Sequence, residues 1–354
     1  MFSFFSRKKP TQPKESAPQL NLSQRKTYEY PTSGRIYDEM QTDAMVQTAL
    51  NVKKLAVSCS DWKIEPASDT PEAKRHAEFV MEAFQRMEGS PISIVYQAMD
   101  AFAKGWSLQE LVWEESDGRI WLKAVRSKDP GSFGLDIDAF GRIQGLFLEV
   151  AGEARRHLPI EKFALYIYRR GYASPRGQSD LDGAHRHWKA KRGLLDAWQV
   201  HLERFAMPTV MGAFGTTVGP DQQSQILRAL ENLQNSTAIV YPNDISISTL
   251  GGQKEPSTGF QDAIDFHNRE IARAILGQTL ATDEGRRVGS LSLGKVHLQV
   301  LLLQIGALRK EVADSVMTEQ VIRPLVEANF GPVAIPRFVF EEPKLDVFSN
   351  GRLE

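Results

Sequence analysis

The side chains best suited to chemistry gather in one polar segment, Gln278–Ser290, which contains two glycines that permit unusual backbone angles. The polar and charged residues at its centre are Thr282, Asp283, Glu284, Arg286 and Arg287. The glycine pattern Gly285-x-x-x-Gly289-Ser290 lacks the lysine and the preceding strand of a phosphate-binding loop. The residue types therefore predict a mobile charged loop and argue against a nucleotide site.

A second group of reactive side chains begins a long helix predicted from Asp180 or Asp182 to Phe205. His185 and His187 suggest a metal site, but two residues apart on a helix they face different sides, and no cysteine or carboxylate pattern completes the site. The same turns carry the basic residues Arg186, Lys189, Lys191 and Arg192. Because a helix start prefers acids, something other than local helix stability must account for this basic run.

Composition bounds the class of protein. The 354 residues are 42% hydrophobic and 25% charged, as in soluble globular proteins, and could form two or three domains. The formal net charge of −1 gives no basic excess of the kind that binds nucleic acid tightly. A single cysteine, Cys59, excludes an intramolecular disulfide and fits a reducing place of assembly. No apolar run reaches the roughly 20 residues of a membrane span, and the first ten residues have the wrong order for a signal peptide, so we expect a soluble, unexported protein without a cofactor.

The first half of the chain mixes helix and strand signals after a Pro- and Ser-rich arm over residues 1–27. Thr70-Pro71-Glu72 is typical of a helix start, and Asp117-Gly118 of a hairpin turn. The expected helices are 37–58, 70–87 and 91–103, and the expected strands are 62–66, 106–114, 120–125, 133–137, 143–150 and 163–168. This half is predicted to be an α+β unit, and nothing in it is typical of a catalytic site.

The second half contains a compact β-α-β-β pattern enclosed by long helices. Its expected strands are 209–214, 238–241, 245–250 and, near the end, 337–340; its expected helices are 221–233, 258–277 and 291–330. We expect Thr258 to cap the helix at 258–277, with Gln261 reaching back to it in a capping box. The last helix would span roughly 50 Å, and Pro324 should kink or end it because proline lacks the amide donor.

Two blocks of residues resemble the portal proteins of Mu-like tailed phages and prophages. One block is Ile271–Leu280, followed by Gly289-Ser290 and Gly294–His297. The other comprises Gly171, Pro175, Gly177, Trp188-Lys189, Trp198, Glu203–Phe205 and Met207-Pro208. The resemblance covers most of Tyr28–Phe340.

The resemblance implies an α+β portal fold with an α/β wing, a long helical stem, a small αβ clip and a long kinked wing helix. The segments would be a flexible arm (1–27), the wing (28–178), stem helix 1 (179–207), the clip (208–257), stem helix 2 (258–277), the channel loop (278–290), the long wing helix with its strand (291–340) and a tail (341–354). Many portals continue into a helical crown, which would be absent or vestigial here.

For function, the resemblance implies a non-enzymatic ring of identical subunits, twelvefold in the family, at one capsid vertex of the virion. The ring would conduct double-stranded DNA without sequence specificity during packaging and ejection. Its channel-loop arginines would make weak phosphate contacts, and the basic run at 186–192 would face DNA, bridge subunits or face solvent. Partners would be the terminase large subunit, which would carry the ATP chemistry, a head-tail adaptor and the major capsid protein, with assembly in the host cytoplasm.

Two alternative functions belong to other classes of protein. A nucleic-acid-acting enzyme would need a carboxylate cluster, a nucleophile with its base, or a phosphate loop, and the sequence has none at suggestive spacing. A monomeric α+β interaction module is disfavoured by two long helices, each with one apolar side, which a closed ring of neighbours would cover.

Overall fold

The computed structural model describes residues 33–138, 142–148, 155–171, 176–206, 209–214, 219–233, 245–250, 258–278 and 291–341. These residues form two compact units. Unit 1 holds the described residues of Met1–Thr42, Leu50–Asp182 and Lys295–Glu354, and unit 2 those of Asp43–Ala49 and Gly183–Gly294.

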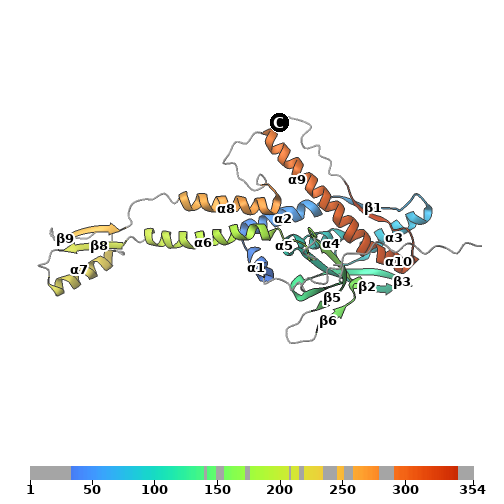
Figure 1. Cartoon of the computed structure of the whole chain (residues 1–354), viewed down its shortest axis with the longest axis horizontal. Coiled ribbons are helices and arrows are strands. Elements are labelled where there is room, and N and C mark those ends of the chain that lie inside the picture. Colours follow the sequence, from blue (N-terminus) through green and yellow to red (C-terminus); the bar gives the residue numbers. More distant parts are fainter. Residues whose placement is uncertain are drawn as a thin grey trace, which may run out of the picture. The chain divides into compact units, whose positions relative to one another are not determined.

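The elements alternate between helix and strand in the first half and become mainly helical in the second (Figure 1). In chain order they are α1 (Ser33–Met40), α2 (Ala44–Ser58), β1 (Trp62–Glu65), α3 (Pro71–Arg86), α4 (Pro91–Ala98), α5 (Ala101–Lys104), β2 (Trp106–Ser116), β3 (Arg119–Lys128), the 3-10 turn η1 (Pro130–Ser132), β4 (Phe133–Ile137), β5 (Ile143–Leu148), β6 (Arg156–Leu158), the 3-10 turn η2 (Ile160–Lys162), β7 (Phe163–Ile167), α6 (Leu181–Ala206), β8 (Thr209–Phe214), α7 (Pro220–Leu233), β9 (Ile245–Leu250), α8 (Thr258–Leu276), α9 (Leu291–Val312), the π-helical segment η3 (Ala313–Ile322), α10 (Arg323–Phe330) and β10 (Arg337–Phe340).

Two antiparallel sheets, β3-β2-β7 and β4-β5-β6, form the centre of unit 1. The predicted hairpin is confirmed: β2 and β3 meet at Asp117 and Gly118, whose φ angles of 56° and 70° suit a tight turn. One hydrophobic cluster joins the two sheets, and its buried members are Trp106, Leu108, Phe133, Leu135, Leu146, Phe163 and Leu165. A third, two-stranded sheet joins an early segment of the chain to a late one, because β1 pairs with β10.

The segments α9, η3 and α10 follow one another without a gap and form one long C-terminal helix. Two of its side chains make hydrogen bonds to strand edges. The Gln320 amide accepts from the Leu165 N–H and donates to the Leu165 carbonyl on β7, both at 2.8 Å. The Asn329 amide makes the same pair of bonds with Ile120 on β3, at 2.9 and 2.8 Å. Since β7 and β3 are the two edges of one sheet, both of its edges are partly closed by the same helix.

Three predicted helices are interrupted. The helix expected over 37–58 is wrong, because Asp43 accepts from the N–H groups of Met45 and Val46 and begins α2 anew after α1. The helix expected over 91–103 likewise divides into α4 and α5. The helix expected over 291–330 continues past Pro324, and its departure from α-helical geometry is the π-helical segment η3.

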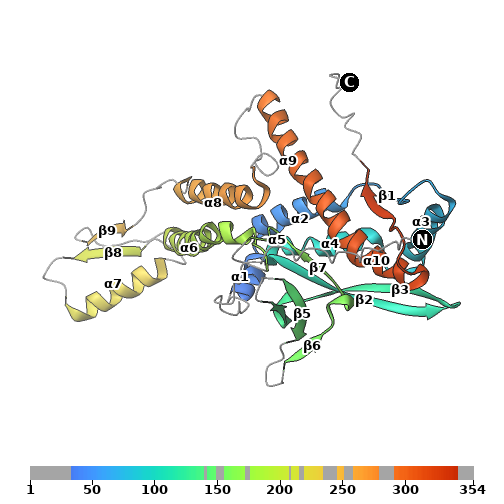
Figure 2. The same cartoon turned by 45° about the vertical axis from the view of Figure 1, so that its right-hand side comes forward.

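Unit 2 contains the α6/α8 helix pair, the antiparallel strands β8 and β9, and the helix α7 (Figure 2). Both strands match their predicted bounds, and α7 begins at Pro220, one residue before its predicted start. The strand predicted at 238–241 lies outside the described residues.

Candidate functional site

The helices α6 and α8 lie side by side within unit 2 (Figures 1 and 2). The Trp198 indole stacks on the Phe260 ring, with the ring centroids 6.4 Å apart and the planes inclined by 7°. Towards the start of α6, Gly183 lies beside Ala274 of α8, since a Cβ built on Gly183 would be 3.5 Å from the Ala274 Cβ, in ordinary van der Waals contact. These contacts fix one face of each helix against the other.

Two histidines face each other between these contacts. His187 Nδ1 and His267 Nδ1 are 3.1 Å apart, and Arg186 Nε donates to His187 Nε2 at 3.0 Å. Because Nε2 accepts from Arg186, the neutral His187 ring carries its proton on Nδ1, which faces Nδ1 of His267. Burial, followed by the Arg186 charge, lowers the pKa of His187, and Glu270 only partly offsets this. Among the described residues, no group of three or more His, Cys, Asp or Glu side chains could hold a metal ion.

The basic run on α6 does not act as one surface. Arg186, Lys189 and Arg192 are exposed, and the Arg192 guanidinium lies 4.9 Å from the Trp188 ring centroid. Lys191 is buried, and its Nζ lies 2.7 Å from Asp43 Oδ2, the residue that caps α2. The charge of Lys191 is therefore neutralised within its own chain, whereas a DNA-facing or intersubunit role for the three exposed residues stays a prediction.

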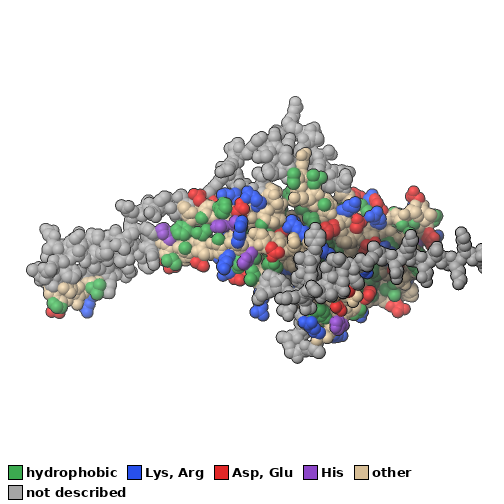
Figure 3. All heavy atoms as spheres, viewed as in Figure 1, with side chains coloured by type: hydrophobic (Ala, Val, Ile, Leu, Met, Phe, Trp, Pro, Cys, Tyr) green, Lys and Arg blue, Asp and Glu red, His purple; other side chains and the backbone are tan. Residues whose placement is uncertain are grey.

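The same helix pair exposes large apolar side chains. Leu195, Val200 and Leu202 on α6 are 41%, 49% and 44% exposed, and Phe266 on α8 is 48% exposed. On the face shown in Figure 3, hydrophobic side chains gather on the helix pair among histidine and basic side chains. Large contiguous apolar patches on a surface are typical of contacts with another protein.

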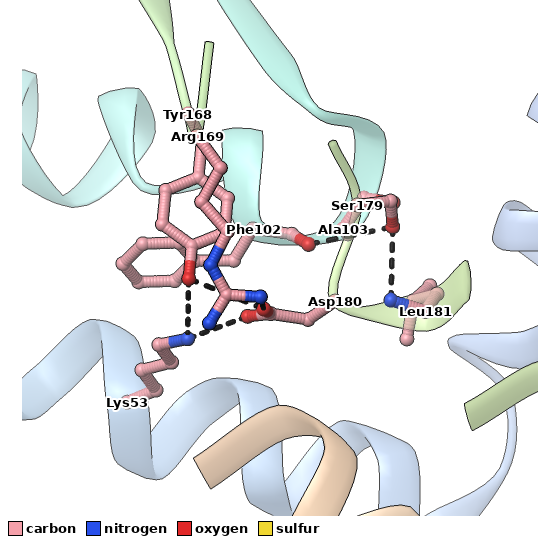
Figure 4. A network of polar contacts seen from close by, with 8 residues as sticks. All are labelled: Lys53, Phe102, Ala103, Tyr168, Arg169, Ser179, Asp180 and Leu181. Carbon is pink, nitrogen blue, oxygen red and sulfur yellow. Dashed lines mark hydrogen bonds and ion pairs between the residues drawn. The ribbon is translucent and has the colours of Figure 1, made fainter. Parts of the chain in front are cut away.

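A buried ionic network anchors the start of α6 within unit 1 (Figure 4). Lys53 Nζ, from α2, lies 2.6 Å from Asp180 Oδ2 and donates to the Tyr168 hydroxyl at 3.0 Å. Arg169 Nη1 approaches the other carboxylate oxygen at 3.1 Å. Burial lowers the pKa of Lys53 and raises the pKa of Asp180, and the attraction between the two offsets part of both shifts. We call Lys53, Tyr168, Arg169 and Asp180 the α6 anchor.

The backbone around the α6 anchor is tightly constrained. Gly177 has a φ of 75°, and a Cβ there would lie 2.1 Å from the Tyr168 carbonyl oxygen, so only glycine fits. Ser179 Oγ donates to the Ala103 carbonyl at 2.6 Å and accepts from the Leu181 N–H at 2.9 Å. The first turn of α6 is thereby tied to α5, as Figure 4 shows.

The sequence predicted only part of this site. The predicted channel-loop residues Thr282, Asp283, Glu284, Arg286 and Arg287 lie outside the described residues. The α6 anchor was missed, because Asp180 before a helix is typical of an ordinary cap and its partner Lys53 lies 127 residues away. Among the described helices, none combines the length and apolar character that a membrane span needs.

Comparisons with known proteins give the family and the fold. Residues 34–348 match the model of the family described as the portal protein of Mu bacteriophage. The Mu-like prophage FluMu protein gp29 of Haemophilus influenzae is 23% identical over 342 residues, covering 89% of this chain and 61% of the relative. The portal protein of Escherichia phage Mu is 24% identical over 272 residues, covering 75% of this chain and 51% of the relative. The chain thus spans between half and two thirds of these relatives' lengths.

A solved structure has the same fold at low sequence identity. The neck of a native gene transfer agent particle, computed with C12 symmetry, contains a chain with a TM-score of 0.66 and 11% identity. The match covers 91% of this chain and 87% of that one, so the fold extends over both units.

Proposed function

Since this chain belongs to the family of Mu bacteriophage portal proteins, we propose that it assembles into a ring that conducts double-stranded DNA through one vertex of a phage capsid. The observation that carries the proposal is the family match over residues 34–348, which includes every described element except Ser33 at the start of α1. The α+β portal fold predicted from the sequence is confirmed.

The exposed apolar side chains of the helix pair support the ring. Leu195 and Leu202 lie seven residues apart and so share one side of α6, while Phe266 is exposed on α8. In a closed ring, each subunit contacts the next head to tail, and such a contact would bury these apolar surfaces between identical neighbours. The C12 symmetry of the gene transfer agent neck, whose chain has the same fold, favours twelve subunits.

The DNA contacts would be electrostatic and non-specific. The loop at 278–290 would carry Arg286 and Arg287 into the channel, where each ring position repeats them. The exposed residues Arg186, Lys189 and Arg192 would add contacts from the helix pair or bridge its neighbours. Such contacts hold phosphates without reading bases, which suits DNA that must slide.

The protein would have a structural role in the virion. The segment 208–257 would be the clip on which the terminase large subunit docks during packaging and the head-tail adaptor afterwards, with the major capsid protein around the ring. ATP hydrolysis would belong to the terminase, and assembly would take place in the host cytoplasm.

Native mass spectrometry with negative-stain images tests the ring directly. The purified protein should give closed rings of about twelve subunits with a central hole. Leu195→Glu/Leu202→Glu should lower the population of closed rings at least tenfold, because it places charges in the buried contact. Leu55→Glu, which changes a 47% exposed leucine on α2, is the matched control and should leave the rings intact.

A monomer or dimer at all concentrations, even with capsid protein present, would contradict the ring. Rings that persist in the double variant would show instead that the subunits meet through another surface.

A further inference from the structure

A groove of about 1000 Å³ lies in unit 1 between α9 and the end of β10. Its α9 wall includes Leu302, Leu303, Gly306 and Ala307, and its other wall includes Phe340 and Glu341. An ion pair between Arg337 and Asp314, at 3.0 Å, lies among the groove-lining residues at the η3 end. A groove of this volume can hold several side chains.

The α9 wall is apolar and largely uncovered. Leu303 is 76% exposed, the highest value among the exposed large hydrophobic residues of the described chain. A Cβ built on Gly306 would meet no atom within 4 Å, so open space lies directly above this part of the helix. Between Gln299 and Lys310 only Ile305 is buried, although Arg309 donates to the Val57 and Ala56 carbonyls of α2 at 3.2 and 2.7 Å. The apolar face around Leu303 and Gly306 is therefore uncovered.

The chain itself leads from β10 into this groove. β10 ends at Phe340, and Glu341, the last described residue, still lines the groove. Three residues later the sequence reads Lys344-Leu-Asp-Val-Phe348, in which three of five side chains are apolar. The family match extends through Phe348, so this apolar segment belongs to the region that defines the family.

Tethering favours this segment over any free partner. Only Glu342 and Pro343 separate Lys344 from the groove wall, and three residues span about 10 Å. A short tether of this kind gives a local concentration on the order of millimolar. The groove-lining residues Lys310 and Glu341 offer both signs of charge to Asp346 and Lys344.

We propose that residues 344–348 fold back into the groove of their own chain and place Leu345 and Val347 against Leu303 and Gly306 of α9. This contact fastens α9 to the β1–β10 sheet. Because α9 directly follows the segment predicted as the channel loop, the tail would set the position from which that loop begins. The inference does not depend on ring formation.

A disulfide test places the segment directly. Gly306→Cys and Val347→Cys are combined in a Cys59→Ser background, with the two single-cysteine variants as controls. After mild oxidation, the pair should give a disulfide within one chain, seen as a faster-moving monomer on a non-reducing gel and as a linked peptide by mass spectrometry. A disulfide between two chains would assign the groove to a second copy and overturn the proposal, as would the absence of any disulfide.

Hydrogen exchange provides an independent readout without cysteines. In Leu345→Asp/Val347→Asp, amides of residues 299–310 should exchange roughly tenfold faster than in the unchanged protein. Ser349→Asp adds a charge beside the apolar segment and should leave these amides unchanged. Equal exchange in all three proteins would overturn the proposal, whether or not rings form.

Discussion

The ion pair between Lys53 and Asp180 gives the clearest prediction for a single residue. Asp180 has a fully buried side chain, so Lys53→Met leaves a buried carboxylate whose partners are the Tyr168 hydroxyl, at 3.2 Å, and the half-exposed Arg169. Removing one partner of a buried pair typically costs about 3–5 kcal/mol, and we expect the free energy of unfolding, measured in urea, to fall by that amount. The Lys53→Met/Asp180→Leu double variant should be less destabilised than the sum of the single changes.

The exposed pair Lys63–Glu65 is the control for this experiment. Its side chains are 52% and 45% exposed, so Lys63→Met should leave the free energy of unfolding almost unchanged. Equal effects of Lys53→Met and Lys63→Met would show that the α6 anchor contributes no more than a surface contact.

The His187–His267 pair predicts a dependence on pH. The folded-state pKa of His187 is lowered, so the unfolded chain binds more protons below about pH 6.5, the ordinary histidine value. Stability contributed by the neutral ring is therefore complete at pH 7.5 and is lost as the pH falls towards the folded pKa. Urea unfolding at pH 7.5 and 5.5 should show a smaller loss in His187→Phe than in the unchanged protein, whereas His157→Gln on β6 should behave like the unchanged protein.

Single residues were predictable where their role is local. The cap at Thr70 is confirmed, because its side chain accepts from the Ala73 N–H three residues on. Lys191 and Asp180 were not predictable, since their partners Asp43 and Lys53 lie 148 and 127 residues away. The amino acids at 186–192 indicate charge, but only packing determines which charge is already neutralised.

At the scale of elements, the long C-terminal helix acts on the sheet through Asn329. Asn329→Leu keeps the size of the side chain but leaves the Ile120 N–H and carbonyl at the β3 edge without their partner, which costs about 1–3 kcal/mol for a buried group. Because the site is partly exposed, we expect the lower end of this range, measured by urea unfolding. Asn51→Leu, at an exposed position of α2, is the control; an equal loss there would attribute the effect to leucine on a helix surface.

Elements were predicted well where periodicity and turn residues agree. The strand at 337–340 has its predicted bounds, and the hairpin around Asp117 is found as expected. The break between α1 and α2 was missed because the apolar spacing continues across it. The break is made by Asp43, which caps α2 and binds Lys191. The π-helical segment η3 has no sequence signal of its own, since Thr318 and Gln320 acquire their roles only from β10 and β7.

At the scale of the whole molecule, DNA binding by the proposed ring should depend on the loop arginines and not on overall charge, since the chain has a formal net charge of −1. Arg286→Gln/Arg287→Gln should leave ring assembly unchanged but flatten the slope of log K against log salt by about 0.9 for each phosphate that the ring no longer neutralises, equally for unrelated DNA sequences. The control, Lys74→Gln/Arg75→Gln on α3, removes the same charge from an exposed surface. If both double variants flatten the slope equally, the rings bind DNA through diffuse charge, and the segment 278–290 is not the channel contact.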